Sequence, residues 1–141
     1  MEDTPPGPVD GLAQAAARLE QLNGTDRVPS GWYGFAQPYG WSLLVASVHD
    51  ALTQRYPNYQ VFQVKEKFGG LRFYCSVGVE PWAQALIARA EERAETTCQL
   101  TGRPGARLRT NPGGWAATLC DELAQAFEAG TPLWELSTGT G

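Results

Sequence analysis

Apolar side chains recur with helical spacing in two segments of the first half of the chain. In residues 10–24 they begin after an Asp, a residue favoured at helix starts, and stop at an Asn-Gly pair. In residues 41–56 they cover one broad face at about 100° per residue, and Pro57 ends the pattern. Residues 25–40 are rich in Pro, Gly and aromatic side chains. We therefore predict two amphipathic helices joined by an ordered but irregular connection.

The clearest pattern is a pair of alternating segments, residues 59–68 and 71–77, that flank a Gly-Gly pair. Two glycines between alternating segments are typical of an antiparallel β-hairpin with a two-residue primed turn. With the glycines at the centre of the turn, the register places Glu66 opposite Phe73.

This register gives the hairpin one apolar and one cationic face. Glu66 is the only acid on the apolar face, where a carboxylate is costly unless it is paired or protonated. We expect a structural acid that pairs with Arg89 or Arg93; the alternative is a catalytic or ligand-binding acid.

The cationic face carries Lys65, Lys67, Arg72 and Tyr74. It suits phosphates and a stacked base, although solvation alone also explains exposed basic residues.

The rest of the chain alternates short helical and strand patterns. Residues 81–97 start with Pro and predict a third helix with Trp82 on its inner face. Residues 106–110 and 115–119 predict a short hairpin, and residues 120–130 a last helix, after which Leu133 and Trp134 are expected to dock. The fold class is therefore α+β: a hairpin packed with helices, plus a C-terminal hairpin and helix.

The length of 141 residues fits one domain. We expect a single α+β domain over residues 10–136, between flexible tails at 1–9 and 137–141. The N-terminus has neither the basic nor the apolar region of a signal peptide, and no apolar run is long enough to span a bilayer. Three cysteines do not suggest a secreted disulfide scaffold. A cytoplasmic protein without a membrane partner is expected.

Charge is unevenly distributed. The net charge of −4 combines three basic and six acidic residues in 1–64, eight basic and five acidic residues in 65–109, and four acidic and no basic residues in 110–141. His49 is the only histidine, and no Ser or Cys stands in a nucleophile pattern. We therefore expect neither an enzyme nor a cofactor; an enzyme built on Glu66 and His49 is the least favoured alternative.

Residues 98–130 have the order of a treble-clef zinc module: a knuckle, a hairpin and a helix start. The knuckle is Cys98-Gln99-Leu100-Thr101-Gly102, and Cys120 opens the helix. Structural zinc needs four Cys or His ligands, and neither Thr101 nor Leu123 supplies one. We therefore expect no metal, with Cys98 and Cys120 as vestigial ligand positions. A disulfide between them, or a metal held with help from Cys75 or another chain, stays open.

The ten residues Lys65–Tyr74 resemble the signature of an uncharacterised family of small phage, prophage and bacterial proteins. The resemblance covers roughly residues 40–123 and implies a C-terminal treble-clef-like zinc module, degenerate here at Thr101 and Leu123. It also implies a setting of mobile elements or conflict between microbes, and it brings no activity. Its further matches are Gly40-Trp41, Leu44, Cys98, Gly102, Gly113-Gly114-Trp115 and Leu119-Cys120.

Two functions follow as hypotheses. The first is a non-enzymatic protein that docks on a partner protein, a toxin or a host enzyme, as an immunity (toxin-neutralising) or host-modulating factor. Exposed aromatic side chains would serve as its anchors, and the candidates are Trp32, Tyr33 and Trp41. The alternative is a nucleic-acid-binding accessory protein that uses the cationic hairpin face.

Overall fold

The computed structural model describes residues 7–136 and has the predicted α+β fold. Its elements are α1 (Leu12–Glu20), β1 (Gly34–Phe35), the 3-10 turn η1 (Tyr39–Trp41), α2 (Ser42–Arg55), β2 (Val61–Lys67), β3 (Gly70–Cys75), α3 (Pro81–Ala94), β4 (Arg107–Thr110), β5 (Ala116–Leu119), α4 (Asp121–Glu128) and α5 (Leu133–Leu136). No helix among them is long and apolar enough to cross a membrane.

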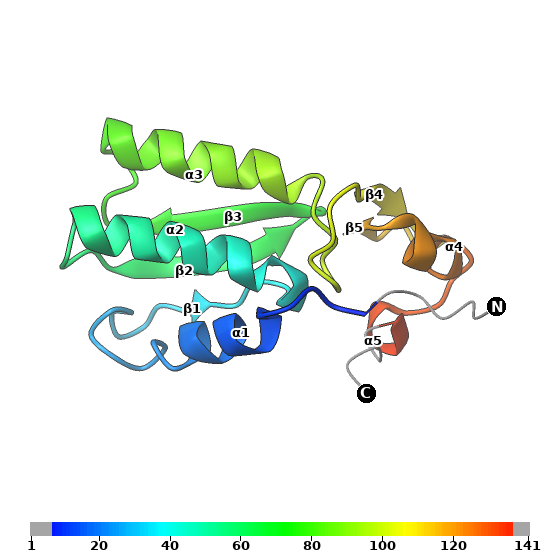
Figure 1. Cartoon of the computed structure of the whole chain (residues 1–141), viewed down its shortest axis with the longest axis horizontal. Coiled ribbons are helices and arrows are strands. Elements are labelled where there is room, and N and C mark those ends of the chain that lie inside the picture. Colours follow the sequence, from blue (N-terminus) through cyan, green and yellow to red (C-terminus); the bar gives the residue numbers. More distant parts are fainter. Residues whose placement is uncertain (1–6, 137–141) are drawn as a thin grey trace.

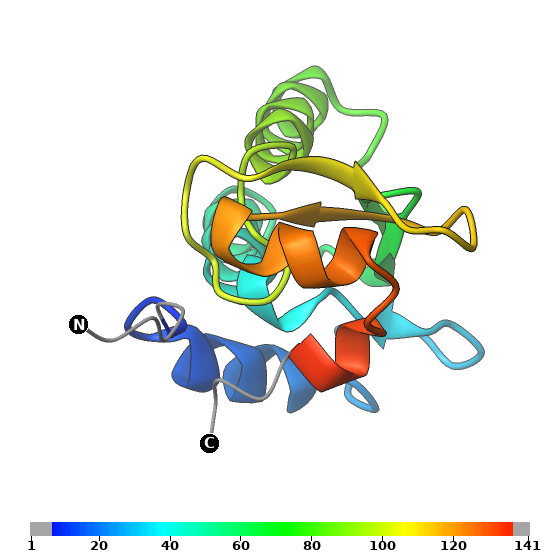
Figure 2. The ribbon, with the colours of Figure 1, turned by 90° about the vertical axis from the view of Figure 1, so that its right-hand side faces the viewer.

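The molecule has two parts side by side (Figure 1). In the larger part, a three-stranded sheet in the order β1-β2-β3 packs against α2 and α3, and α1 lies beside α2. In the smaller part, β4 and β5 form an antiparallel pair on which α4 packs, followed by α5. Figure 2 looks at this smaller part from its end, with α2 and α3 nearly end-on behind it.

Each part has its own hydrophobic cluster. The first extends from Ala15 to Ala94 along the chain, and its largest fully buried side chains are Trp41 and Tyr59. The second lies in the smaller part and is centred on Phe127. It consists of Cys98, Ala106, Ala117, Leu119, Cys120, Leu123 and Phe127. The division falls at the end of α3, so the knuckle predicted from the sequence belongs to the second cluster.

The predicted helices and both hairpins are confirmed, with ends that differ by a few residues. Strand β1, which pairs in parallel with β2, is absent from the prediction because it is only two residues long and lies in the irregular connection. Trp82 is partly exposed instead of inward, and Ala83 takes the buried position on α3. Residues 137–141, a predicted tail, lie outside the described residues.

The start of the described chain contacts the smaller part of the molecule; residues 1–6 of the predicted tail lie outside the described residues. The backbone N–H of Val9 donates a hydrogen bond to the carbonyl of Thr101 (2.8 Å). The Arg103 Nε donates to the carbonyl of Gly7 (2.9 Å). Thr101 belongs to the knuckle and Arg103 directly follows it, so the two contacts tie the segment before α1 to the smaller part of the molecule.

Gly40 makes a close backbone contact between the two parts. Its N–H donates to the carbonyl of Gln99 (2.7 Å). A Cβ at this position would lie 2.2 Å from the carbonyl oxygen of Cys98 and 2.5 Å from the carbonyl carbon of Gln99. Next to it, the indole Nε1 of Trp41 donates to the carbonyl of Thr97 (2.8 Å). Only glycine lets the two backbones approach this closely.

Strand β3 forms one edge of the three-stranded sheet. The backbone N–H of Phe73 on this strand donates to Glu91 Oε2 of α3 (3.4 Å). Burial raises the pKa of the Glu91 carboxyl, while the Phe73 N–H and the charge of Arg72 act in the opposite direction. The helix therefore supplies an acceptor to a strand edge that has no neighbouring strand.

His49 on α2 is buried in the first cluster beside Tyr59. Its Nδ1 lies 2.5 Å from the Tyr59 hydroxyl, and the ring meets Phe35 edge-on. Burial lowers the pKa of His49; the nearby charges of Arg27 and Arg18 lower it further, against the opposing effect of Asp50. The imidazole is therefore a neutral core group near pH 7.

We predict that Gly40→Ala lowers the free energy of unfolding by about 2 kcal/mol or more, because the new methyl group meets backbone atoms that cannot move independently. Urea denaturation measures the loss. Gly7→Ala is the matched control, since a Cβ at Gly7 meets nothing within 4 Å, and its effect stays within about 0.5 kcal/mol. Equal stability of the two variants would show that the two parts are not held at Gly40.

We also predict that the protein loses stability as the pH falls from about 7.5 to about 5.5. The unfolded chain binds a proton at His49 with a pKa of about 6.5, whereas the folded chain resists it, so stability is complete above this pKa and declines below it. Denaturation at several pH values measures the slope. His49→Gln, which removes the only histidine, flattens it; an unchanged slope in this variant contradicts the assignment.

Candidate functional site

The β2–β3 turn is centred on Phe68 and Gly69, one residue earlier than predicted. Both residues have positive φ, 54° and 83°, as a type I′ turn requires. Lys67 consequently pairs with Gly70, and Glu66 pairs with Leu71 instead of Phe73. The predicted register is wrong because it treated both glycines as central residues of the turn.

Glu66 stabilises this turn through a hydrogen bond. Its Oε2 accepts from the N–H of Gly69 (2.6 Å), and the carbonyl of Gly69 accepts from the Thr118 hydroxyl of β5 (2.7 Å). Within residues 7–136 Glu66 forms no ion pair, so the predicted partners Arg89 and Arg93 are wrong. The half-buried Glu66 carboxylate thus stabilises the turn. Through the Thr118 hydrogen bond the turn contacts the smaller part of the molecule.

Phe68 occupies an unfavourable position. The left-handed conformation costs a residue with a side chain about 1–2 kcal/mol, and a bulky aromatic there is uncommon. The side chain is 77% exposed, so burial within the chain does not offset this cost. The ammonium group of Lys67 lies 5.7 Å from the ring centroid. The position of Phe68 thus lowers the free energy of unfolding and places an exposed aromatic ring at the tip of the hairpin.

Phe68 faces a cleft of about 890 Å³ that we call the aromatic cleft. Two tryptophans complete its aromatic rim: Trp115 from the β4–β5 turn, 74% exposed, and Trp134 from α5, 77% exposed. Phe127 and Leu133 add apolar surface. Figure 2 shows the β4–β5 turn, α4 and α5 at this end of the molecule. An apolar cleft with aromatic side chains at its rim is a typical anchor site for a partner.

The β4–β5 turn that carries Trp115 is held by Asn111. The Asn111 Oδ1 accepts a hydrogen bond from the N–H of Trp115 (2.9 Å), and its N–H donates to the carbonyl of Trp115 (2.9 Å). Gly114 supplies the positive φ of 85° that this turn needs. The Lys65–Tyr74 signature and the Gly-Gly-Trp segment, which both carry the family resemblance, therefore meet at the aromatic cleft.

The predicted binding residues fall into two groups. Lys65 lies directly opposite Arg72, and Tyr74 opposite Gln63, so the cationic hairpin face forms as expected despite the shifted turn. Trp32 and Tyr33 are exposed. Trp41, in contrast, is completely buried and hydrogen-bonded, so its prediction as a binding residue is wrong: its helical spacing reflects the core.

Three aromatic residues of the cleft were not predicted as binding residues. The alternating pattern places Phe68 on the apolar strand face. Trp115 is predicted only as the start of a strand, and Trp134 is expected to dock. Instead, Leu133 packs on the second cluster and Trp134 is exposed. The usable signal was a large aromatic side chain directly next to a Gly-Gly pair, which puts the ring in a turn rather than in a strand.

Cys98 and Cys120 lie together in the second cluster, and both thiols are free. Burial favours the neutral thiol of Cys98, but hydrogen bonds from Thr101 and from the backbone N–H groups of Cys120, Leu100 and Thr101 outweigh it and lower the pKa. Burial and the adjacent Cys98 raise the pKa of Cys120. These hydrogen-bond donors converge on the sulfur of Cys98.

Three or more His, Cys, Asp or Glu side chains do not gather into a metal site anywhere in residues 7–136. Thr101 and Leu123, the two positions without a ligand, are both buried beside the cysteines. Cys98 is fully buried, so it is not accessible as a nucleophile. Packing thus occupies the place of the ligands that the resemblance implies.

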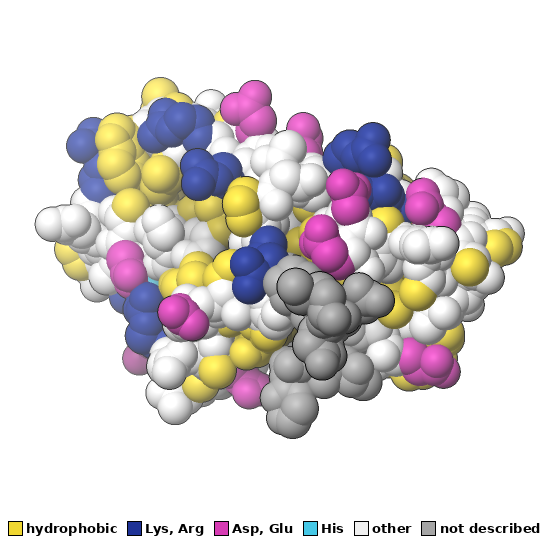
Figure 3. Space-filling model, turned by 45° about the vertical axis from the view of Figure 1, so that its right-hand side comes forward, with side chains coloured by type: hydrophobic (Ala, Val, Ile, Leu, Met, Phe, Trp, Pro, Cys, Tyr) yellow, Lys and Arg dark blue, Asp and Glu magenta, His cyan; other side chains and the backbone are white. Residues whose placement is uncertain are grey.

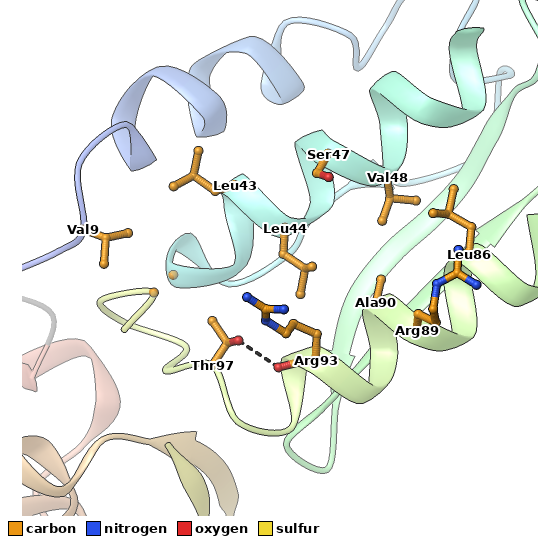
Figure 4. Close-up of a pocket in the computed structure, with 12 residues that line it drawn as sticks. Val9, Leu43, Leu44, Ser47, Val48, Leu86, Arg89, Ala90, Arg93 and Thr97 are labelled. Carbon is orange, nitrogen blue, oxygen red and sulfur yellow. Dashed lines mark hydrogen bonds between the residues drawn. The ribbon is translucent and has the colours of Figure 1, made fainter. Parts of the chain in front are cut away.

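A second hollow, of about 510 Å³, lies between α2 and α3 (Figure 4). Leu44, Val48, Leu86 and Ala90 give it apolar walls, and Arg93 reaches across it. On this side of the molecule hydrophobic and basic side chains lie next to one another, while acidic side chains spread over the smaller part (Figure 3). Nothing in the structure selects an occupant for this groove.

Comparisons of the chain with protein-family models, with curated proteins and with solved structures find no match. The family resemblance and the treble-clef assignment therefore stay predictions. Function is therefore inferred from the geometry of the aromatic cleft and of the cationic hairpin face.

We predict that Thr101→Cys combined with Leu123→His creates a zinc site with Cys98 and Cys120, because Leu123 shares a buried cluster with both cysteines and the buried Thr101 hydrogen-bonds to Cys98. Metal analysis of the double variant should give about one zinc per chain, and added zinc should raise its melting temperature. The wild-type chain and Leu123→His alone are the controls. A folded double variant that takes up no zinc contradicts the knuckle geometry.

Proposed function

We propose that the protein is a non-enzymatic binding protein that docks on a partner protein through the aromatic cleft. The observation that carries the proposal is Phe68, whose left-handed backbone and exposed ring both act against folding. A residue that costs stability in the free protein is explained when its ring is buried by another molecule. Trp115 and Trp134 beside it provide the kind of aromatic cluster that dominates binding energy at protein interfaces.

The partner that fits best is a basic protein. The segment 110–141 supplies most of the cleft and carries four acidic and no basic residues; two of these acids, Glu128 and Glu135, directly follow the lining residues Phe127 and Trp134. Such a surface attracts a positively charged partner and speeds its association. A toxin-neutralising factor that covers a basic toxin, or a factor that modulates a host enzyme, has these properties. The resemblance to phage and prophage proteins supports the same setting.

The partner is identified by affinity capture of the tagged chain from lysate treated with nuclease, followed by mass spectrometry. Recovery of one basic protein at near-equal stoichiometry is the expected result. If this partner is a toxin, its expression alone stops growth and co-expression with the chain restores growth. Capture alone does not place the contact, so the variants below assign it to the cleft.

We predict that Phe68→Asn stabilises the protein and weakens partner binding. Asn-Gly is the preferred pair for a type I′ turn, so the free energy of unfolding rises by about 1 kcal/mol. Loss of an aromatic anchor weakens binding by about 2 kcal/mol, roughly a thirtyfold rise in Kd. Thermal denaturation and calorimetric titration with the purified partner measure the two effects.

Val79→Asn is the matched control, because Val79 is equally exposed but lies outside the cleft. It should leave the Kd unchanged, whereas Trp115→Ala should weaken binding as Phe68→Asn does. A captured partner that binds Phe68→Asn and Trp115→Ala as tightly as the wild-type chain would falsify docking at the cleft.

A further inference from the structure

The side of the three-stranded sheet that faces away from α2 and α3 has an unusual set of side chains, which we call the open sheet face. The strand register places Lys65 beside Arg72, and Lys67 two residues further along β2, all projecting to this side. The helices pack on the opposite side of the strands (Figures 1 and 2). The outward side chains are therefore exposed or half-exposed.

Aromatic rings accompany these cations. Strand β2 has an irregularity between Val61 and Gln63, and Phe62 and Tyr74 line a groove at the β3 edge whose other wall is α3. The ring of Trp32, from the loop before β1, lies 4.9 Å from that of Phe62 at an angle of 33°. Trp32 and Tyr74 are each about half exposed. Flat apolar surfaces thus stand next to positive charge.

The cations of the open sheet face are not neutralised within the described chain. Lys65 and Arg72 are directly opposed on neighbouring strands, an arrangement of like charges that destabilises a sheet. Within residues 7–136, neither residue nor Lys67 forms an ion pair. The charge of Arg72 lowers the pKa of Glu91 at the β3 edge, although burial raises that pKa more strongly. An anionic ligand would remove the repulsion that the fold leaves in place.

We propose that the open sheet face binds single-stranded nucleic acid. The phosphate backbone contacts Lys65, Lys67 and Arg72, and bases stack on Tyr74 and on Trp32. Stacking requires bases with free faces, which a duplex does not offer, so the aromatic rings favour a single strand over double-stranded DNA. This inference does not depend on docking at the aromatic cleft: of the residues named here only Lys67 also lines that cleft.

The test is fluorescence anisotropy with labelled oligonucleotides about 12 nucleotides long, oligo(U) and oligo(dT), titrated with the full chain. Three phosphate contacts predict that log K falls with log salt with a slope of about −2. Binding of oligo(U) alone would assign the face to RNA, and equal binding of both to single strands in general. Absence of binding to either at micromolar protein and low salt would overturn the proposal.

The double variant Lys65→Gln with Arg72→Gln should weaken binding at least tenfold. It should also reduce the magnitude of the salt slope by about 1.4, because two phosphate contacts are lost. Removing two opposed like charges does not threaten the fold, and a thermal melt checks this. Tyr74→Ala should weaken binding while keeping the salt slope, because it removes stacking and no charge.

Two controls make the result specific. Arg89→Gln with Arg93→Gln removes the same charge from the helical side and should change the Kd less than twofold. Phe68→Asn tests the other surface and should leave oligonucleotide binding intact, so that failure of one proposal is distinguished from failure of the other. The proposal is refuted if the Arg89/Arg93 variant loses as much affinity as the Lys65/Arg72 variant. It is also refuted if poly-glutamate at equal charge concentration displaces the oligonucleotide, because the face then attracts anions in general.

Discussion

The structure depends on a backbone-to-backbone contact that only a residue without a side chain permits. At Gly40 the segment before α2 lies against the carbonyls of Cys98 and Gln99, and one hydrogen bond closes the contact. The second joint, between the carbonyl of Gly69 and Thr118, also uses a glycine. Two hydrophobic clusters with few shared side chains are thereby fixed relative to each other. The contacts at Gly40 and at Gly69 together place the turn that bears Phe68 beside the β4–β5 turn.

The elements were predictable wherever one face of a long segment is buried. Helices α2 and α3 and both hairpins follow from spacing alone, since burial selects a period that the sequence displays. Strand β1 was not, because two residues display no period and its pairing with β2 is distant in the chain. The position of the Phe68-Gly69 turn was predicted wrongly for another reason. Local preference favours two glycines at the centre, but the contacts of Glu66 and Thr118 with Gly69 favour the other placement.

The sites were predictable to different degrees. The cations of the hairpin alternate within one segment, so the sequence shows that they share a face, even with the wrong turn. The aromatic cleft joins turns more than forty residues apart, and no local pattern connects Phe68 with Trp115. Trp41 and Trp115 are both preceded by glycine, yet one is buried and the other exposed. What separates them is tertiary contact, which a single sequence does not display.

The acceptor that Glu91 gives to the edge of β3 has a consequence for recognition. A sheet edge with free N–H groups invites a foreign strand, whose main chain binds with little regard to its sequence. Here one edge is the two-residue β1, and at the other the Phe73 N–H is already engaged next to α3. Strand addition, with its tolerance of many partners and its risk of aggregation, is disfavoured on both sides. Recognition by this chain is then left to side chains, where single substitutions during evolution are enough to change a partner.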